Sequence, residues 1–191
     1  MPKSSGSLFC RDPGAGGAEK RSPLNVEAGV EMSSRLPEAL LEKIVQALRE
    51  YFGEDLVAVV LYGSWARGEG RPGSDVDLFV IARNLPRRRF PRILHVHKPV
   101  AGRFPYPVSI LAKEPEEFEG QFPSLYLDLG LDGQVLYDPE RYITPRLARI
   151  RQIIEEAGLY RRRCNGDFVW LWKKPPRRPW VLDWEGFREL P

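Results

Sequence analysis

Two apolar runs, each about as long as a single strand, flank a segment rich in turn residues near the middle of this chain. The first run is Leu56–Tyr62 (LVAVVLY) and the second is Asp75–Ala82 (DVDLFVIA). Continuous runs of apolar, β-branched residues are typical of strands that are buried within a sheet. We therefore expect the core of this protein to form around a sheet that contains both segments.

Helices and a further strand are expected around these two strands. Apolar residues recur at helical spacing over residues 36–52 and 144–157, and another helix is expected from about Pro86 to His97. Pro107–Ala112 predicts a third strand. Leu125–Leu131 alternates like a strand, yet a short helix fits this segment equally well.

The two ends of the chain differ from its middle. Residues 1–31 are rich in Gly, Ser and Pro without any periodicity, so we expect a disordered N-terminal extension. Met32 follows this stretch directly and is a second candidate for the start of translation. Residues 32–140 are expected to form the main domain. Residues 141–191 are expected to form an appendage of a helix and a Trp- and Arg-rich hairpin that turns at Asn165-Gly166.

The formal net charge of +3 hides an uneven distribution of charged residues. Residues 1–140 carry 17 basic and 20 acidic side chains, whereas residues 141–178 carry 11 basic and 3 acidic ones. The basic segment could face the phosphate groups of a nucleotide or of a nucleic acid. A solvated arginine-rich surface is an equally weighted alternative, because charge blocks of this size are common.

Nothing in the chain predicts a membrane span or a secretion signal. A transmembrane helix needs about 20 consecutive apolar residues, and no such run occurs. The N-terminal residues lack the apolar centre of a signal peptide. Cys10 and Cys164 lie far apart and outside any metal-ligand spacing, so we expect two free thiols and a cytoplasmic protein.

Two aspartates stand at the start of the second apolar run. Residues two apart in a strand point to the same face, so Asp75 and Asp77 aim both carboxylates at one place, while Val76 and Leu78 face the buried side. Two carboxylates held this close repel each other unless a cation lies between them. Mg²⁺ is the usual cation where oxygen ligands and phosphate meet. The pair therefore indicates a metal site.

Gly63 and Ser64 lie where the first strand ends and a short helix begins. Glycine allows backbone N–H groups to approach a phosphate closely, the serine hydroxyl adds a donor, and a helix start adds positive potential. A phosphate site and a metal site then meet at the same edge of the sheet. That combination is what nucleotidyl transfer requires.

The segment Gly63-Ser64-Trp65-Ala66-Arg67-Gly68, followed by Ser74-Asp75-Val76-Asp77-Leu78, resembles the signature of the DNA polymerase β-like nucleotidyltransferase superfamily. The small prokaryotic branch called the minimal nucleotidyltransferase (MNT) group is the most similar to it. Motif and flanking strands cover roughly residues 36–112. The resemblance implies an α+β fold, in which helices pack on one face of a small mixed sheet, with a C-terminal helix and β-hairpin added.

The same resemblance implies roles for individual residues. It assigns the triphosphate to Gly63 and Ser64, and the catalytic metals to Asp75 and Asp77. Ser74 would fix the loop, and Arg67 would support the loop or contact phosphate; these six residues are the predicted site. The nucleotidyltransferase domain would then be residues 32–140.

The implied activity is a Mg²⁺-dependent transfer of a nucleoside monophosphate, AMP from ATP above other nucleotides, onto a hydroxyl acceptor, with Mn²⁺ as an alternative metal. The MNT group pairs with HEPN-domain toxins, so a HEPN-type protein is the expected partner, and a protein tyrosine the expected acceptor. Nucleic acid is a less favoured partner, and no membrane is expected.

One position departs from the superfamily pattern. Active members usually carry a third carboxylate on a later strand, where it binds the second metal and helps to deprotonate the acceptor. Here that position holds Ser109. Glu114, Glu116 or Asp128 could substitute from a neighbouring element. The alternative prediction is therefore a catalytically impaired protein that binds a nucleotide or a partner. A third, weaker one is a transferase for RNA or antibiotics with the basic segment as its acceptor site.

Other candidates are weaker. His95 and His97 diverge on a helix and lack further metal ligands at suitable spacing, so no zinc site is expected. The arginines at 87, 88, 89 and 92 could steer a triphosphate or an RNA end, or form a solvated helix face. Trp170 and Trp172 share a strand face, which favours a small core over binding of single-stranded nucleic acid.

Overall fold

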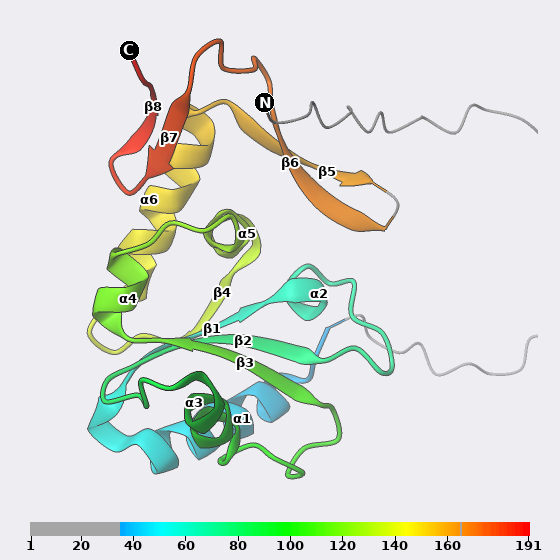
Figure 1. The fold of residues 1–191 in the computed structure, drawn as a ribbon. Helices are drawn as coiled ribbons and strands as arrows, with labels where there is room; N and C mark the ends of the chain where they lie inside the picture. Colours follow the sequence, from blue (N-terminus) through cyan, green and yellow to red (C-terminus); the bar gives the residue numbers. More distant parts are fainter. Residues whose placement is uncertain (1–34, 165) are drawn as a thin grey trace, which may run out of the picture.

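The computed structural model describes residues 35–164 and 166–191. Its centre is a four-stranded sheet with the strand order β3-β2-β1-β4, visible edge-on in the middle of Figure 1. β1 pairs antiparallel with β2 and β4, whereas β2 and β3 are parallel, so the sheet is mixed, as expected. Its strands are β1 (Leu56–Tyr62), β2 (Val76–Ala82), β3 (Val108–Lys113) and β4 (Gln134–Tyr137).

Helices cover both faces of this sheet (Figure 1). The helices of one face are α1 (Glu38–Phe52) and α3 (Arg89–His97), with the 3₁₀ turn η1 (Gly53–Asp55) after α1. The helices of the other face are α4 (Pro115–Glu119), α5 (Leu125–Asp132) and α6 (Ile143–Glu156).

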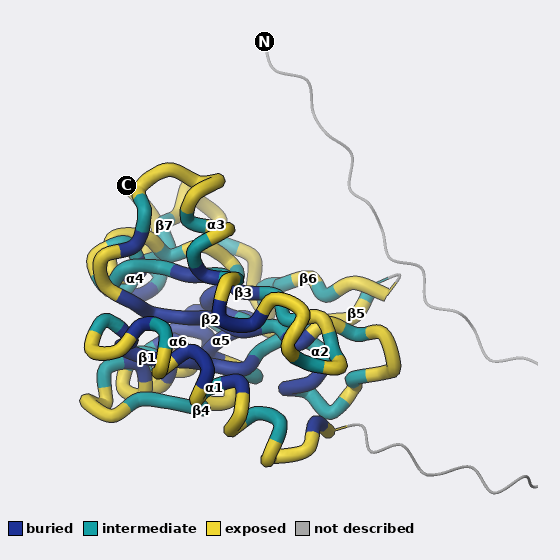
Figure 2. The backbone as a smooth tube through the Cα atoms, turned by 90° about the horizontal axis from the view of Figure 1, so that it is seen from below, coloured by how far each residue is buried: buried dark blue, intermediate teal, exposed yellow. Residues whose placement is uncertain are grey.

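The prediction that helices pack on one face only is therefore wrong. The first six residues of β1 are all buried, and so are all residues of β2 except Asp77. A strand that is apolar on both sides needs cover on both sides. In Figure 2, which colours the backbone by burial, β2 runs as a buried segment through the middle of the molecule.

β2 alternates between two hydrophobic cores. Val76, Leu78 and Val80 belong to the core beneath α1 and α3, whereas Phe79 and Ile81 belong to the core beneath α5 and α6. Because side chains alternate along a strand, Asp77 points to the same side as Phe79. The α5–α6 face is therefore the one on which a site around Asp77 would be built.

The last part of the chain packs against this second face. Ile150 of α6 lies so close to α5 that a Cβ on Gly130 would be 2.4 Å from its Cγ2 atom. Two antiparallel hairpins follow; their strands are β5 (Leu159–Cys164), β6 (Asp167–Trp172), β7 (Trp180–Asp183) and β8 (Gly186–Glu189). The expected hairpin is thus confirmed, although residue 165 of its turn lies outside the described residues.

Several local predictions are settled by the structure. The ambiguous segment Leu125–Leu131 is helical, within α5. Cys164 is disulfide-bonded, so the prediction of a free thiol is wrong at this position, and Cys10 lies outside the described residues, as do the predicted extension 1–31 and Met32. Among the described residues, no helix is both long and apolar enough to span a bilayer.

Candidate functional site

Three side chains form a row across one end of the sheet. Asp77 pairs with Ser109 of β3 on one side and with Tyr62 of β1 on the other. Residues that pair directly in neighbouring strands share a face of the sheet. The row Ser109, Asp77 and Tyr62 therefore faces the α5–α6 side, with Asp77 in the middle.

Asp75 and Asp77 differ in their surroundings. β2 begins at Val76, so Asp75 is an exposed residue of the preceding loop, whereas Asp77 is half-buried in the strand. Burial, and then the negative charge of Asp75, raise the pKa of Asp77 above its usual range, while Arg67 opposes the shift. Burial and the charge of Asp77 raise the pKa of Tyr62 to about 12. The two carboxylates thus lie close enough to repel each other.

Gly63 lies directly against the carboxylate of Asp77. A Cβ atom at position 63 would be 2.2 Å from the Oδ2 atom of Asp77, and the backbone of Gly63 has a φ of +75°. Both the close approach and the positive φ require glycine. The short helix α2 (Gly63–Ala66) begins at this residue, so the glycine-serine corner and the aspartate occupy the same place in the structure.

The loop between Gly63 and Asp77 is anchored on Trp65 and Ser74. Trp65 is buried, and a Cβ on Gly70 would lie 2.0 Å from its ring, so the loop packs directly over the indole. The indole Nε1 donates to the carbonyl of Ser74 at 3.2 Å. The Ser74 hydroxyl accepts a hydrogen bond from the backbone N–H of Arg71 at 3.1 Å.

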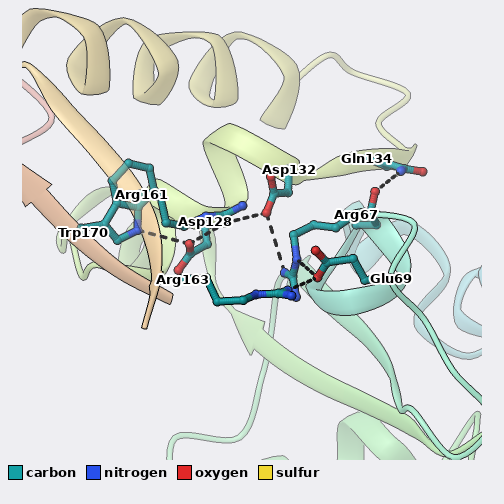
Figure 3. A network of polar contacts seen from close by, with 9 residues as sticks. Arg67, Glu69, Asp128, Asp132, Gln134, Arg161, Arg163 and Trp170 are labelled. Atoms are coloured by element: carbon teal, nitrogen blue, oxygen red, sulfur yellow. Dashed lines mark hydrogen bonds and ion pairs between the residues drawn. The ribbon is translucent and has the colours of Figure 1, made fainter. Parts of the chain in front are cut away.

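Arg67 is held by other residues of the protein (Figure 3). Its Nε donates to Glu69 at 3.0 Å, and its guanidinium lies 3.7 Å from the carboxylate of Asp132. It also lies over the ring of Phe168, 4.8 Å from the ring centre. Arg67 therefore joins the motif loop to α5 and to the β5–β6 hairpin.

The three proposed substitutes for the third carboxylate lie on other elements, and two of them are bound to other groups. Glu114 follows the last residue of β3, whereas Ser109 is near its start, and its carboxylate accepts from the N–H of Leu85 at 2.9 Å. Glu116 lies beyond it in α4. Asp128 is on the correct side of the sheet, but it is bound to Arg161 at 2.9 Å and to the indole of Trp170 at 3.2 Å.

The carboxylate pair suits one divalent cation. In residues 35–164 and 166–191, no group of three or more His, Cys, Asp or Glu side chains is arranged to hold a metal ion. Asp75 and Asp77 offer two hard oxygen donors whose mutual repulsion a cation would relieve. Mg²⁺ is commonly bound by one or two carboxylates together with substrate phosphates and water, which matches this donor set.

The weaker candidates for a functional site, the arginine cluster and the two histidines, lie in α3 or just before it. The arginine cluster is at the start of α3, on the opposite face from Asp77, and its member Arg92 is bound to Glu117 at 2.6 Å. His95 contacts the hydroxyl of Tyr51 at 3.0 Å, and His97 accepts from the N–H of Ile110 at 3.2 Å. Both histidines thus have structural partners.

Two further features concern the tryptophans of the hairpin and the last residue of β1. The prediction that the hairpin tryptophans form a core is confirmed, because Trp170 and Trp172 pack against the second core. Tyr62 was missed as a neighbour of Asp77. The available signal was its place as the last residue of the first strand, immediately before Gly63.

The match to known proteins agrees with this geometry. The family model described as "Nucleotidyltransferase domain" matches residues 41–160. A protein of Methanocaldococcus jannaschii, named "Putative protein adenylyltransferase MJ1305", is 32% identical over 132 residues, which are 65% of this chain and 87% of that protein.

Two solved structures are more distant. The complex of a tri-AMPylated HEPN toxin from Shewanella oneidensis with its MNT antitoxin matches at 14% identity and a TM-score of 0.44, over 62% of this chain and 87% of the other. Spectinomycin adenyltransferase AAD(9) from Enterococcus faecialis matches at 11% identity and a TM-score of 0.40, over 62% and 65%. The family assignment rests on the family model and the archaeal relative: the chain belongs to the nucleotidyltransferase domain family.

Proposed function

We propose that this chain is a Mg²⁺-dependent nucleotidyltransferase that transfers AMP from ATP to a hydroxyl group. The observation that carries the proposal is the contact between Gly63 and Asp77, because it joins the phosphate corner to the carboxylate pair. The name of the archaeal relative, an adenylyltransferase, supports AMP as the transferred group. ATP and Mg²⁺ are both abundant in the cytoplasm, where we expect the protein to act.

Each residue of the predicted site has a task in this proposal. Gly63 and Ser64 bind the triphosphate through the backbone and the hydroxyl group. Asp75 and Asp77 would hold Mg²⁺, or Mn²⁺ in its place, which would supply positive charge for the triphosphate and lower the pKa of the acceptor hydroxyl. Ser74 keeps the loop in its conformation through its bonds to Trp65 and Arg71.

Arg67 supports the loop through Glu69 and adds positive charge beside Asp77. All six residues lie within residues 32–140, which we propose as the nucleotidyltransferase domain, with residues 141–191 as its appendage. α6 of this appendage packs closely on α5 through Ile150.

We propose a protein as the acceptor, modified on a tyrosine hydroxyl, and a HEPN-type toxin as the partner that carries it. Two observations support a protein acceptor: the resemblance of the motif to the MNT group, and the name of the archaeal relative as a protein adenylyltransferase. A nucleic-acid acceptor has less support, because Trp170 and Trp172 are used in the core.

The carboxylate pair can be tested directly. Asp75→Asn and Asp77→Asn should each lower Mg²⁺-dependent transfer from α-labelled ATP by about 100-fold or more, since each removes a charged ligand. Asp167→Asn, at an exposed position of the hairpin, is the matched control and should keep full activity. If either site variant retained full activity, the metal assignment would be wrong.

A second candidate function is favoured by Ser109. With a hydroxyl in place of the third carboxylate beside Asp77, the protein would bind a nucleotide and a partner without turning the nucleotide over. Labelled ATP, Mg²⁺ and a cell lysate separate the two functions, because only the transferase leaves label on a macromolecule. Sensitivity of the labelled band to protease or to ribonuclease then identifies the class of acceptor.

A further inference from the structure

The β5–β6 hairpin places basic and aromatic side chains beside the motif loop. Nearly all of the hairpin lies beyond residue 160, where the match to the family model ends. Arg161 pairs with Trp170 and Arg163 pairs with Phe168, so these four side chains share one face of the hairpin. That face contacts α5 and the motif loop (Figure 3).

Arg161 anchors the hairpin to α5. Only 9% of its side chain is exposed, and its guanidinium forms ion pairs with Asp128 at 2.9 Å and with Asp132 at 2.6 Å. The indole of Trp170 donates to the same oxygen of Asp128. A buried guanidinium that binds two carboxylates fixes the base of the hairpin beside the motif loop.

Arg163, two residues further along the same face, has a different environment. Its side chain is 53% exposed, and it donates to the Oε2 atom of Glu69 at 2.7 Å. The same oxygen accepts from the Nε of Arg67. Glu69 thus lies between two guanidinium groups, one from the motif loop and one from the hairpin.

Phe168 holds the guanidinium groups together. Its ring centre lies 4.3 Å from the guanidinium of Arg161, 4.7 Å from that of Arg163 and 4.8 Å from that of Arg67. Stacking on an aromatic ring stabilises an arginine without using its N–H donors. The donors of Arg163 therefore stay available to a ligand that can displace Glu69.

The contact with Glu69 is easily exchanged. Both Glu69 and Arg163 are solvent-exposed, and ion pairs between exposed side chains contribute little to stability. A polyphosphate carries more charge than a carboxylate and accepts paired hydrogen bonds from a guanidinium. Arg67 lies one helical turn after Gly63, and its charge acts on the carboxylate of Asp77. Arg163 shares Glu69 and the ring of Phe168 with Arg67, so both guanidinium groups lie on the same side of the proposed triphosphate site.

We propose that Arg163 is a phosphate-binding residue for the nucleoside triphosphate, supplied by the hairpin beside Arg67. Glu69 occupies the place of a phosphate between the two guanidinium groups and is displaced when the triphosphate binds. This inference rests on the function proposed for Gly63 and Asp77, and it adds to that site a residue from outside the matched family model.

The test uses the full chain, Mg²⁺ and a non-hydrolysable ATP analogue in a calorimetric binding experiment. Arg163→Ala should weaken binding of the analogue about tenfold, the usual effect of losing one charge-assisted hydrogen bond to phosphate. Arg162→Ala is the matched control, because this exposed residue pairs with Val169 on the other face of the hairpin. AMP lacks the outer phosphates, so its affinity should be the same for all three proteins.

Glu69→Gln separates phosphate binding from a purely structural contact. If Arg163 binds phosphate, this variant should bind the analogue more tightly than the wild type, about twofold or more, because the competing carboxylate is gone. If the ion pair only held the hairpin in place, Glu69→Gln and Arg163→Ala would break the same contact and weaken binding together. The proposal would be overturned if Glu69→Gln and Arg163→Ala changed the affinity for the analogue in the same direction.

The outcomes also distinguish this inference from the proposed function. If the wild type binds the analogue and Arg163→Ala behaves like Arg162→Ala, the role of Arg163 is refuted while the nucleotide site stands. The nucleotide site itself is refuted if the wild type binds no analogue and Asp77→Asn leaves transfer from labelled ATP unchanged. The role of Arg163 is then refuted with it. Thermal denaturation of each variant checks that it is folded.

Discussion

Ser109 lies directly beside Asp77 in the parallel ladder between β2 and β3, and both side chains face α5 and α6. In active nucleotidyltransferases that share the motif, a carboxylate is usual at this position. Here the row across the sheet offers a hydroxyl, a carboxylate and the phenol of Tyr62. Because Ser109 pairs with Asp77, the rate of catalysis should depend on the residue type at position 109.

Replacing Ser109 by aspartate should therefore raise the rate of AMP transfer. A carboxylate at this place would help to deprotonate the acceptor hydroxyl, and general-base catalysis contributes about 100-fold or more where geometry is good. We expect at least about a tenfold rise in kcat for Ser109→Asp, measured with α-labelled ATP. Ser109→Asn is the control of equal size without charge. Equal rates for the two variants would contradict this role of the position.

Gly63→Ala should abolish transfer, because the added Cβ would collide with the Asp77 carboxylate at 2.2 Å. Gly68 provides the matched control. It also has a positive φ, +71°, but nothing lies within 4 Å of a Cβ added there. Gly68→Ala should therefore cost only backbone strain, about 1 kcal/mol. Kinetics together with thermal denaturation of both variants would test this, and equal losses of activity would refute the collision argument.

Asp77 should give the metal-free protein a characteristic pH dependence. Its pKa is raised in the folded state, by burial and by the charge of Asp75. A folded protein with a raised carboxyl pKa binds more protons than the unfolded chain, so the stability contribution of this group is lost as pH rises through that pKa. Asp77→Asn removes the unfavourable charge and should raise the Tm of the metal-free protein at neutral pH.

The gain in Tm should shrink as the pH is lowered to about 4, where the carboxyl is increasingly protonated in both states. Thermal denaturation in the presence of EDTA, at several pH values, measures this difference. Asp167→Asn at an exposed position should show no such trend. Added Mg²⁺ should raise the Tm of the wild type more than that of Asp77→Asn. A Tm difference independent of pH would argue against the raised pKa.

Gly130→Ala should destabilise the contact between α5 and α6. The new methyl group would lie 2.4 Å from the Cγ2 atom of Ile150 and 2.8 Å from its Cβ. Overpacking of this kind costs about 1–3 kcal/mol, more than the gain in helix propensity of about 0.5–1 kcal/mol. Urea denaturation should show the loss. The double variant with Ile150→Ala should recover part of it, whereas full additivity would contradict the proposed contact.

Much of the site could be predicted because strand periodicity is local. The apolar run after Asp75 sets which residues of β2 are buried, and so places Asp77 opposite Val76 and Leu78. The resemblance to the superfamily pointed to Ser109 on the third strand, and the structure pairs this residue with Asp77. The roles assigned to these residues remain predictions until the variants are measured.

Other features depended on partners that a local pattern does not specify. The segment Leu125–Leu131 became a helix where it packs on α6, although its spacing fitted a strand equally well. The helix expected from residue 144 begins at Ile143, because Asp138, which lies outside the helical pattern, accepts the N–H groups of Tyr142, Ile143 and Thr144. The second layer of helices is another such feature.

The sequence by itself determined the two buried strands, the glycine-serine corner and the carboxylate pair, because each follows from periodicity or from residue type over a few positions. The departure at Ser109 was implied by the resemblance of the motif to the superfamily. Only the tertiary structure decided that helices cover both faces, that Arg67 lies beside Asp132 of α5, and that the hairpin reaches the motif loop. The contact between Arg163 and Glu69 spans 94 residues of chain. Such contacts depend on how separate elements pack, and the sequence pattern of a short segment does not specify that packing.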